Sequence, residues 1–259
     1  MAGNQVAVLA LPGMSLNATT FPDFPAPTLA PDFNRFAPVS QDGIVTYLDV
    51  VDELARDPAW RDAERRIVVG HSFGGMVALA WLLRHHAAGP ARCDGLVLIG
   101  TTAGPMFDAV RVRVAGIRGR EWRVGVRPFV ALWHRPAVTR GFKRLLSRET
   151  RTVDFRTLRH RSDLAVGLAG WRNTDWRARM AYRQAMDGFD VRARLGEIRV
   201  PTIVLHGSRD RLFPLHAARR LAEGLPRAEL RVIPGAGHVL PLTHGETVVG
   251  AVRDLLAAS

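Results

Sequence analysis

The chain has 259 residues, 47% of them hydrophobic, which is enough for the core of one domain and excludes wholesale disorder. Its formal net charge is +12, and its single cysteine, Cys93, excludes an internal disulfide framework and a cysteine-rich metal site. Apolar runs such as residues 76–83 are too short to span a bilayer, and residues 1–5 lack the cationic start of a signal peptide, so we expect a cytoplasmic protein with no membrane partner.

Short apolar runs and helical spacings alternate along the chain. Residues 6–11 have the pattern of a buried strand. The Pro-rich stretch 21–38 is typical of loop, with a possible edge strand at 28–30. Apolar positions within residues 44–54 recur at helical spacing, and Asp42 is the candidate N-cap.

The same alternation continues to the end of the chain. Further strands are predicted at residues 66–70, 95–100, 201–206 and 228–233. Further helices are predicted at residues 73–84, 215–224 and 245–257. Strands alternating with helices predict the α/β class, with a mostly parallel sheet covered on both faces.

Residues 105–199 interrupt this rhythm. They contain no apolar strand run and four of the six Trp residues. Helical patterns are predicted there at residues 129–132, 137–146, 155–168 and 176–186. We therefore expect a helical cap, or lid, at 105–199, inserted into a core formed by residues 1–104 and 200–259.

The excess of positive charge lies in this predicted cap. The segment carries a net +13, whereas the rest of the chain carries −1. Such a surface could attract nucleic acid, an anionic lipid surface or an acidic protein. All cations except Lys143 are Arg, so a compositional bias explains the excess equally well, and no nucleic-acid-binding signature accompanies it.

A serine lies at the junction of a predicted strand and a predicted helix. Gly70-His71-Ser72-Phe73-Gly74 matches G-x-S-x-G in the strand–turn–helix context that this motif requires. The sharp turn raises the hydroxyl of Ser72 above the sheet, and small neighbours let strand and helix approach closely. Ser72 is therefore the candidate nucleophile, and an ordinary turn serine is the alternative.

A serine hydroxyl needs a base, and the base needs a carboxylate to orient it. His238 follows the fifth predicted strand of the core, and Asp210 follows the fourth. Asp187 and Asp190, on the cap side, are the rival carboxylates. The alternatives are a surface histidine for His238 and a turn or helix-cap residue for Asp210. The other histidines show no metal-ligand spacing, so we expect no metal and no cofactor.

These motifs resemble those of the α/β-hydrolase superfamily over nearly the whole chain. The matching segments are residues 11–14, 70–75, 206–214 and 237–238. The resemblance implies that Ser72, Asp210 and His238 are nucleophile, acid and base, and that residues 105–199 are the family's cap. The chain is most similar to small esterases, lactonases and thioesterases of the pimeloyl carrier-protein methyl ester esterase type.

The same resemblance implies an oxyanion hole formed by the backbone amides of Met14 and Phe73. The family often has His-Gly where this chain has Pro12-Gly13, which affects the geometry of that loop. A second departure is the absence of the family's N-terminal hairpin, which implies about six strands.

The expected chemistry is hydrolysis of a carboxylic ester, lactone or thioester of a small hydrophobic acyl substrate, through an acyl-enzyme. Acyl transfer, cyclisation, C–C cleavage or cofactor-free perhydrolysis on the same residues is the first alternative. A receptor-like hydrolase with slow turnover is the second. The basic cap could dock an acidic carrier protein or a coenzyme A derivative.

Overall fold

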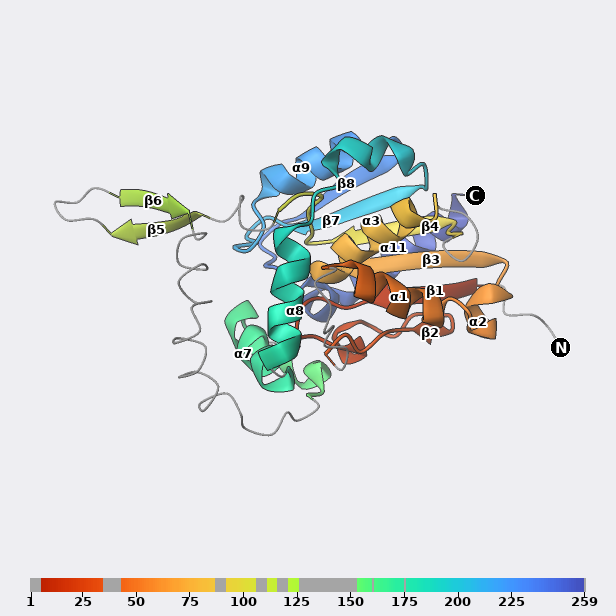
Figure 1. Cartoon of the computed structure of the whole chain (residues 1–259), viewed down its shortest axis with the longest axis horizontal. Coiled ribbons are helices and arrows are strands. Elements are labelled where there is room, and N and C mark those ends of the chain that lie inside the picture. The colour runs from red at the N-terminus through yellow and green to blue at the C-terminus, as the bar shows by residue number, and fades with distance from the viewer. Residues whose placement is uncertain are drawn as a thin grey trace.

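The core of the protein is one parallel sheet (Figure 1). The computed structural model describes residues 6–34, 43–86, 92–105, 111–115, 121–125, 153–159, 161–174 and 176–258. The six strands run in the order β2-β1-β3-β4-β7-β8, and every neighbouring pair is parallel. In chain order they are β1 (Val6–Leu11), β2 (Thr28–Leu29), β3 (Arg65–His71), β4 (Gly95–Ile99), β7 (Thr202–Gly207) and β8 (Ala228–Ile233). The predicted fold class and strand number are thereby confirmed.

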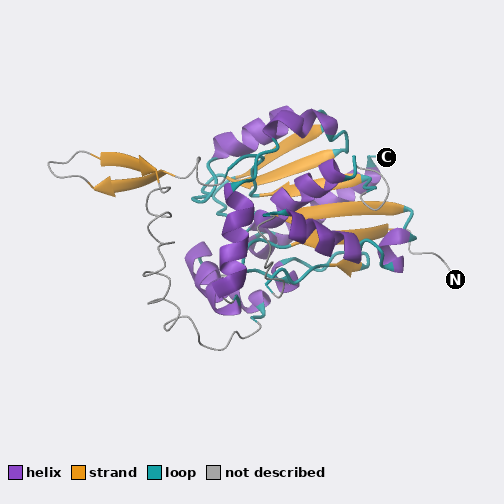
Figure 2. Cartoon of the chain, viewed as in Figure 1, coloured by secondary structure: helices purple, strands orange, loops and turns teal. Residues whose placement is uncertain are grey.

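Both faces of the sheet are buried, as the apolar runs indicate. Successive residues of β1 point to opposite faces, so Leu9 joins one apolar cluster and Val8 joins the other. One face packs against α1 (Val45–Leu54), α3 (Phe73–Arg84) and α9 (Leu215–Gly224). The other face packs against α11 (Gly245–Ala257), which gives the layered arrangement of Figure 2.

Most core elements lie where the sequence predicts them, with small differences at helix starts. Helix α1 begins with Ile44 in the N-cap position and no side-chain cap, whereas Asp42 lies outside the described residues. The short helix α2 (Pro58–Arg61), capped by Asp57, was not predicted. Two further short elements, η1 (Ala18–Thr20) and α10 (Leu240–Thr243), shape loops at the carboxyl edge of the sheet.

The predicted helical segment at 105–199 also contains two strands that the sequence analysis did not predict. Strands β5 (Arg111–Ala115) and β6 (Glu121–Gly125) pair antiparallel as a separate two-stranded sheet (Figure 1). Each strand alternates apolar and polar residues, a period of two that a search for continuous apolar runs overlooks. The helices expected at 129–132 and 137–146 lie outside the described residues.

From residue 153 onward, the described part of the segment contains helices, one of them divided into shorter pieces than predicted. The helix expected over 155–168 is divided into η3 (Phe155–Leu158) and α7 (Asp163–Asn173), because Ser162 caps a new helix with its side chain. Helix α8 (Trp176–Asp187) agrees with the prediction, and η4 (Arg192–Glu197) leads back to β7. No helix in the described part of the chain is long and apolar enough to cross a bilayer.

Helix α8 is part of the main core. The buried ring of Tyr182 stacks on Tyr47 with centroids 5.5 Å apart and meets Phe73 edge-on at 4.9 Å. Figure 1 shows α7 and α8 at the carboxyl edge of the sheet, where each β-strand ends and its loop begins. The segment predicted as a cap is thus anchored directly on the residue that follows Ser72.

Candidate active site

Ser72 occupies a strained turn between β3 and α3. Its φ of 52° and ψ of −118° place a non-glycine residue outside the ordinary regions of the backbone map. The end of β4 holds this turn, since the Ser72 amide donates to the Ile99 carbonyl at 2.8 Å. The Thr101 hydroxyl donates to the Ser72 carbonyl at 2.7 Å.

The glycines of the motif are required by close packing. A Cβ atom at Gly74 would overlap the carbonyl oxygen of Leu11 at the end of β1. A Cβ atom at Gly70 would lie 2.7 Å from the Cα of Gly75, which is shorter than real Cβ contacts in proteins. The sequence interpretation of these positions, which assigned them to the close approach of strand and helix, agrees with the geometry.

His238 and Asp210 form a hydrogen-bonded pair. His238 Nδ1 lies 2.8 Å from Asp210 Oδ2, and the two side chains are 7% and 0% exposed. The amides of Leu212 and Phe213 donate to the other oxygen, Oδ1, at 2.8 and 3.0 Å. Burial alone would raise the pKa of the Asp210 carboxyl, but its bonds with His238 and with the two amides hold the pKa below its usual value.

Asp210 therefore satisfies two interpretations that the sequence presents as alternatives. One oxygen forms the turn that leads towards α9, and the other contacts the imidazole. The rival Asp190 pairs instead with the Arg192 guanidinium at an exposed position. The side chain of Asp187 lies outside the described residues. The carboxylate that contacts the imidazole of His238 is thus Asp210.

His71 braces the loop that carries His238. Its Nε2–H donates to the carbonyl of His238 at 3.2 Å, and the two rings are 5.0 Å apart. Complete burial, with a smaller contribution from the nearby His238, lowers the pKa of His71 to about 3. His71 is therefore a neutral donor at ordinary pH, and its hydrogen bond fixes the backbone of the residue beside it.

The predicted site residues gather at one edge of the sheet. A Cβ atom at Gly100, which follows β4 with φ 51°, would lie 3.2 Å from His238 Nδ1 and 3.4 Å from Asp210 Oδ2. A Cβ atom at Gly13 would lie 3.2 Å from the Cβ of Ser72, so the loop that contains Met14 lies beside the serine. Among the hydrogen bonds of the described residues, none uses the amide of Met14 or of Phe73 as its donor.

The sequence analysis missed one residue at this edge. Asp163, the first residue of α7, accepts a hydrogen bond from the His238 amide at 2.8 Å. Its other oxygen accepts from the Val239 amide at 3.4 Å. The contact joins residues 75 positions apart, and Asp163 has no motif around it, so no local pattern could reveal it.

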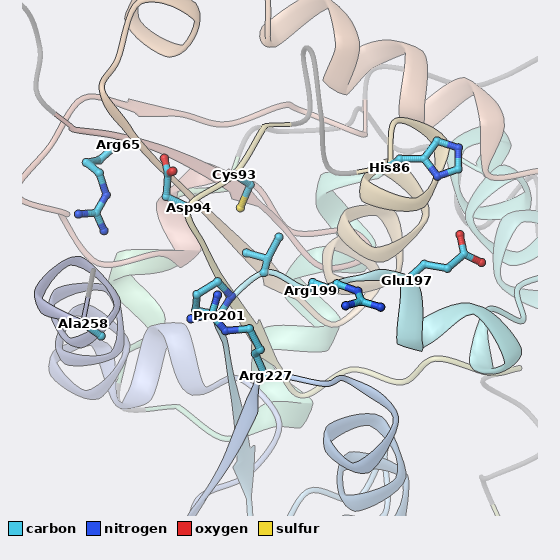
Figure 3. A pocket seen from close by; sticks show the side chains of 10 residues that line it. Arg65, His86, Cys93, Asp94, Glu197, Arg199, Pro201, Arg227 and Ala258 are labelled. Carbon is cyan, nitrogen blue, oxygen red and sulfur yellow. The ribbon is translucent and has the colours of Figure 1, made fainter.

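A separate cavity of about 600 Å³ opens at the opposite edge of the sheet (Figure 3). Arg65 begins β3, and Asp94, Pro201 and Arg227 immediately precede β4, β7 and β8. Sites of parallel α/β sheets form at the other edge, beyond the carboxyl ends of the strands. This cavity is therefore remote from Ser72. Within the described residues, no group of acidic, histidine or cysteine side chains could hold a metal ion.

A parallel sheet with a strained serine and a histidine–carboxylate pair at its carboxyl edge is the arrangement of an α/β enzyme. A family profile of the alpha/beta hydrolase fold matches residues 61–245, so the chain belongs to the alpha/beta hydrolase family. This confirms the resemblance drawn from the sequence motifs.

Curated relatives include hydrolases of two kinds. A pimeloyl-[acyl-carrier protein] methyl ester esterase of Aromatoleum aromaticum is 32% identical over 217 residues, covering 78% of this chain and 82% of that protein. A 2-hydroxymuconate semialdehyde hydrolase of Pseudomonas putida is 30% identical, covering 73% of this chain and 62% of that protein. The family therefore contains esterases and C–C hydrolases at similar distance from this chain.

Solved structures share the fold at lower identity. A lipase-esterase related protein from Clostridium acetobutylicum superimposes with a TM-score of 0.67 at 12% identity, covering 97% of this chain and 95% of that chain. The structure of Est816, described as an N-acyl homoserine lactone degrading enzyme, gives a TM-score of 0.66 at 22% identity, covering 97% and 93%. At such identities the likeness establishes the fold.

Proposed function

We propose that the protein is a serine hydrolase that cleaves a carboxylic ester, lactone or thioester through an acyl-enzyme. The observation that carries the proposal is the buried His238–Asp210 pair at the same sheet edge as the strained Ser72. His238 takes the proton of the Ser72 hydroxyl as the serine attacks the carbonyl carbon. Asp210 keeps the Nδ1 proton of His238 in place, so that Nε2 is free to accept. His238 next gives this proton to the departing alkoxide or thiolate, which leaves as the alcohol or thiol (for a lactone, as the hydroxyl end of the opened ring), while the acyl group stays on Ser72. His238 then takes a proton from water as the water attacks the acyl-enzyme, and it returns that proton to Ser72 as the carboxylic acid leaves.

The oxyanion of the tetrahedral intermediate needs two donors aimed at one point. The amides of Met14 and Phe73 are available for this, since neither is used by an acceptor within the described chain. Phe73 is the first residue of α3, so the helix N-terminus adds its partial positive charge. Each such donor contributes on the order of 3 kcal/mol to the transition state.

Ester hydrolysis is supported over other chemistries by the nucleophile and by the relatives. A serine forms an acyl ester, whereas dehalogenase and epoxide-hydrolase chemistry needs a carboxylate nucleophile. The 32% identical relative is named as a methyl ester esterase. C–C hydrolysis is the second candidate, because relatives named as 2-hydroxymuconate semialdehyde hydrolases match at 30%. Acyl transfer, perhydrolysis and ligand reception on the same residues are further outcomes of the test.

The test compares the Ser72→Ala variant with the wild type on a panel of p-nitrophenyl esters and on a substrate of the C–C hydrolases. We expect the variant to stay folded and to lose turnover, while the exposed Ser162→Ala control keeps it. Trapping the wild-type enzyme and weighing it by mass spectrometry identifies which acyl group forms on Ser72. Unchanged turnover of Ser72→Ala would contradict the proposal, and tight binding with negligible turnover would favour a receptor.

The +13 segment at 105–199 supports docking of an acidic carrier protein or a coenzyme A derivative. Guanidinium groups pair with carboxylates and phosphates, and salt weakens such pairs on a solvated surface. We expect kcat/KM for a carrier-bound acyl ester to fall as salt rises from about 20 to about 500 mM, with the free methyl ester unaffected. Equal salt dependence for both substrates would exclude docking.

A further inference from the structure

Asp163 is the point at which the predicted cap contacts the loop of the proposed base. Its carboxylate spans two successive amides, those of His238 at 2.8 Å and Val239 at 3.4 Å. The preceding residue, Gly237, is shaped for this contact, because a Cβ atom there would overlap Asp163 Oδ2. A carboxylate that accepts from backbone amides makes a stronger bond than a neutral acceptor would.

The apolar surroundings hold the same two segments together. Val166, one turn further along α7, is buried in a cluster with Phe155, Leu16 and Val239. This cluster is separate from the two that cover the sheet. The side chain of Val239 and the amide of His238 therefore both depend on the position of α7.

The remaining bonds of His238 come from the core. Its imidazole contacts Asp210, and its carbonyl accepts from His71 Nε2 and from the Leu240 amide at 3.0 Å. The bond to its amide, by contrast, comes from the cap. The histidine is thus held by two parts of the protein.

We propose that Asp163 is a positioning residue that sets the alignment of His238 and makes it depend on the seating of α7. The inference rests on the proposed function, because it assigns the base role to His238. When α7 is seated, the carboxylate fixes the loop and the base is aligned for catalysis. When α7 moves to admit a bulky acyl substrate, both amides lose their acceptor and the base loses alignment until α7 returns.

The experiment compares Asp163→Ala, Asp163→Asn and the matched control Ser162→Ala. Ser162 accepts from the Ala165 amide at 3.4 Å at an exposed position of the same helix, so its loss removes one weak cap bond and leaves the Asp163–His238 bond in place. We expect Asp163→Ala to lower kcat for p-nitrophenyl butyrate at least tenfold with KM within twofold. Asp163→Asn retains a carbonyl oxygen for the His238 amide and should recover most of the rate. Ser162→Ala should match wild type.

A second readout separates positioning from general stability. The proton shared by His238 Nδ1 and Asp210 gives a low-field proton NMR signal, which should shift or broaden in Asp163→Ala and return in Asp163→Asn. If Asp163→Ala keeps the wild-type kcat and signal while Ser72→Ala is inactive, the inference is wrong and the proposed function stands. If Ser72→Ala is active, the proposed function itself fails. Equal losses in Asp163→Ala and Ser162→Ala would show a merely structural role and overturn the inference.

Discussion

Replacing Asp210 by Asn tests the proposed catalytic pair most directly. The variant keeps an oxygen for the amides of Leu212 and Phe213, so the turn is retained. Its amide nitrogen, however, replaces the oxygen that lies 2.8 Å from His238 Nδ1. Nδ1 must then act as acceptor, which places the imidazole proton on Nε2, the atom that should receive the proton of Ser72.

The size of the effect follows from burial. The Asp210 side chain is 0% exposed, so water does not replace the lost acceptor. Loss of the correct tautomer in a serine triad lowers kcat on the order of 10⁴-fold. At about 1.36 kcal/mol for each factor of ten, this is about 5 kcal/mol of transition-state stabilisation.

The assay is the steady-state kcat of Asp210→Asn on a p-nitrophenyl ester that Ser72→Ala cannot turn over. Asp190→Asn is the control, because the Asp190–Arg192 pair is exposed and does not contact His238. We expect its kcat to equal that of wild type. If Asp210→Asn kept more than about a tenth of the rate, or if both variants lost equally, the assignment of Asp210 would be refuted.

Two further predictions concern stability. Gly74→Ala places a methyl group against the Leu11 carbonyl and should lower the free energy of unfolding, measured by urea titration, by about 3 kcal/mol. Gly167→Ala, in α7 with open space around it, should raise the free energy of unfolding by about 0.5–1 kcal/mol. The same change in both variants would contradict the packing argument. Burial lowers the pKa of His71 to about 3 in the folded chain, against 6.5 for a solvated histidine. Between these two pH values the unfolded chain binds one more proton at this residue than the folded chain does. The free energy of unfolding therefore falls by about 1.4 kcal/mol for each pH unit as the pH drops through that window. His71→Gln should flatten that slope in urea titrations between about pH 7 and pH 4.5, and an unchanged slope would show that His71 does not cause it.

The sequence predicted the elements whose signal is local. Buried strands such as β1 and β3 are continuous apolar runs, and α9 and α11 start and end at the predicted residues. Ser72, Asp210 and His238 could be proposed from the sequence because each follows a strand in a recognisable motif. The pairing of His238 with Asp210, in preference to Asp190, needed the structure, because chain order alone does not show which carboxylate reaches the imidazole.

The features that the sequence analysis did not predict have physical causes as well. Strand β5 alternates Arg111, Val112, Arg113 and Val114, so neither an apolar run nor a helical spacing marks it. The break between η3 and α7 depends on the Ser162 cap, which competes with a long apolar pattern. The Asp163 contacts join segments that meet only after the fold has formed.

Helices α7 and α8, in the described part of the predicted cap, pack against the core to different extents. Tyr182 of α8 is buried between Tyr47 and Phe73, so moving α8 would open an aromatic cluster directly behind Ser72. Helix α7 makes a smaller contact, in which Leu164 and Leu168 are exposed and Val166 faces the cluster beside Val239. Displacing α7 therefore costs less buried apolar area than displacing α8. In our proposal, α7 rather than α8 is therefore the helix that moves to admit substrate, and the Asp163 carboxylate transmits that movement to His238.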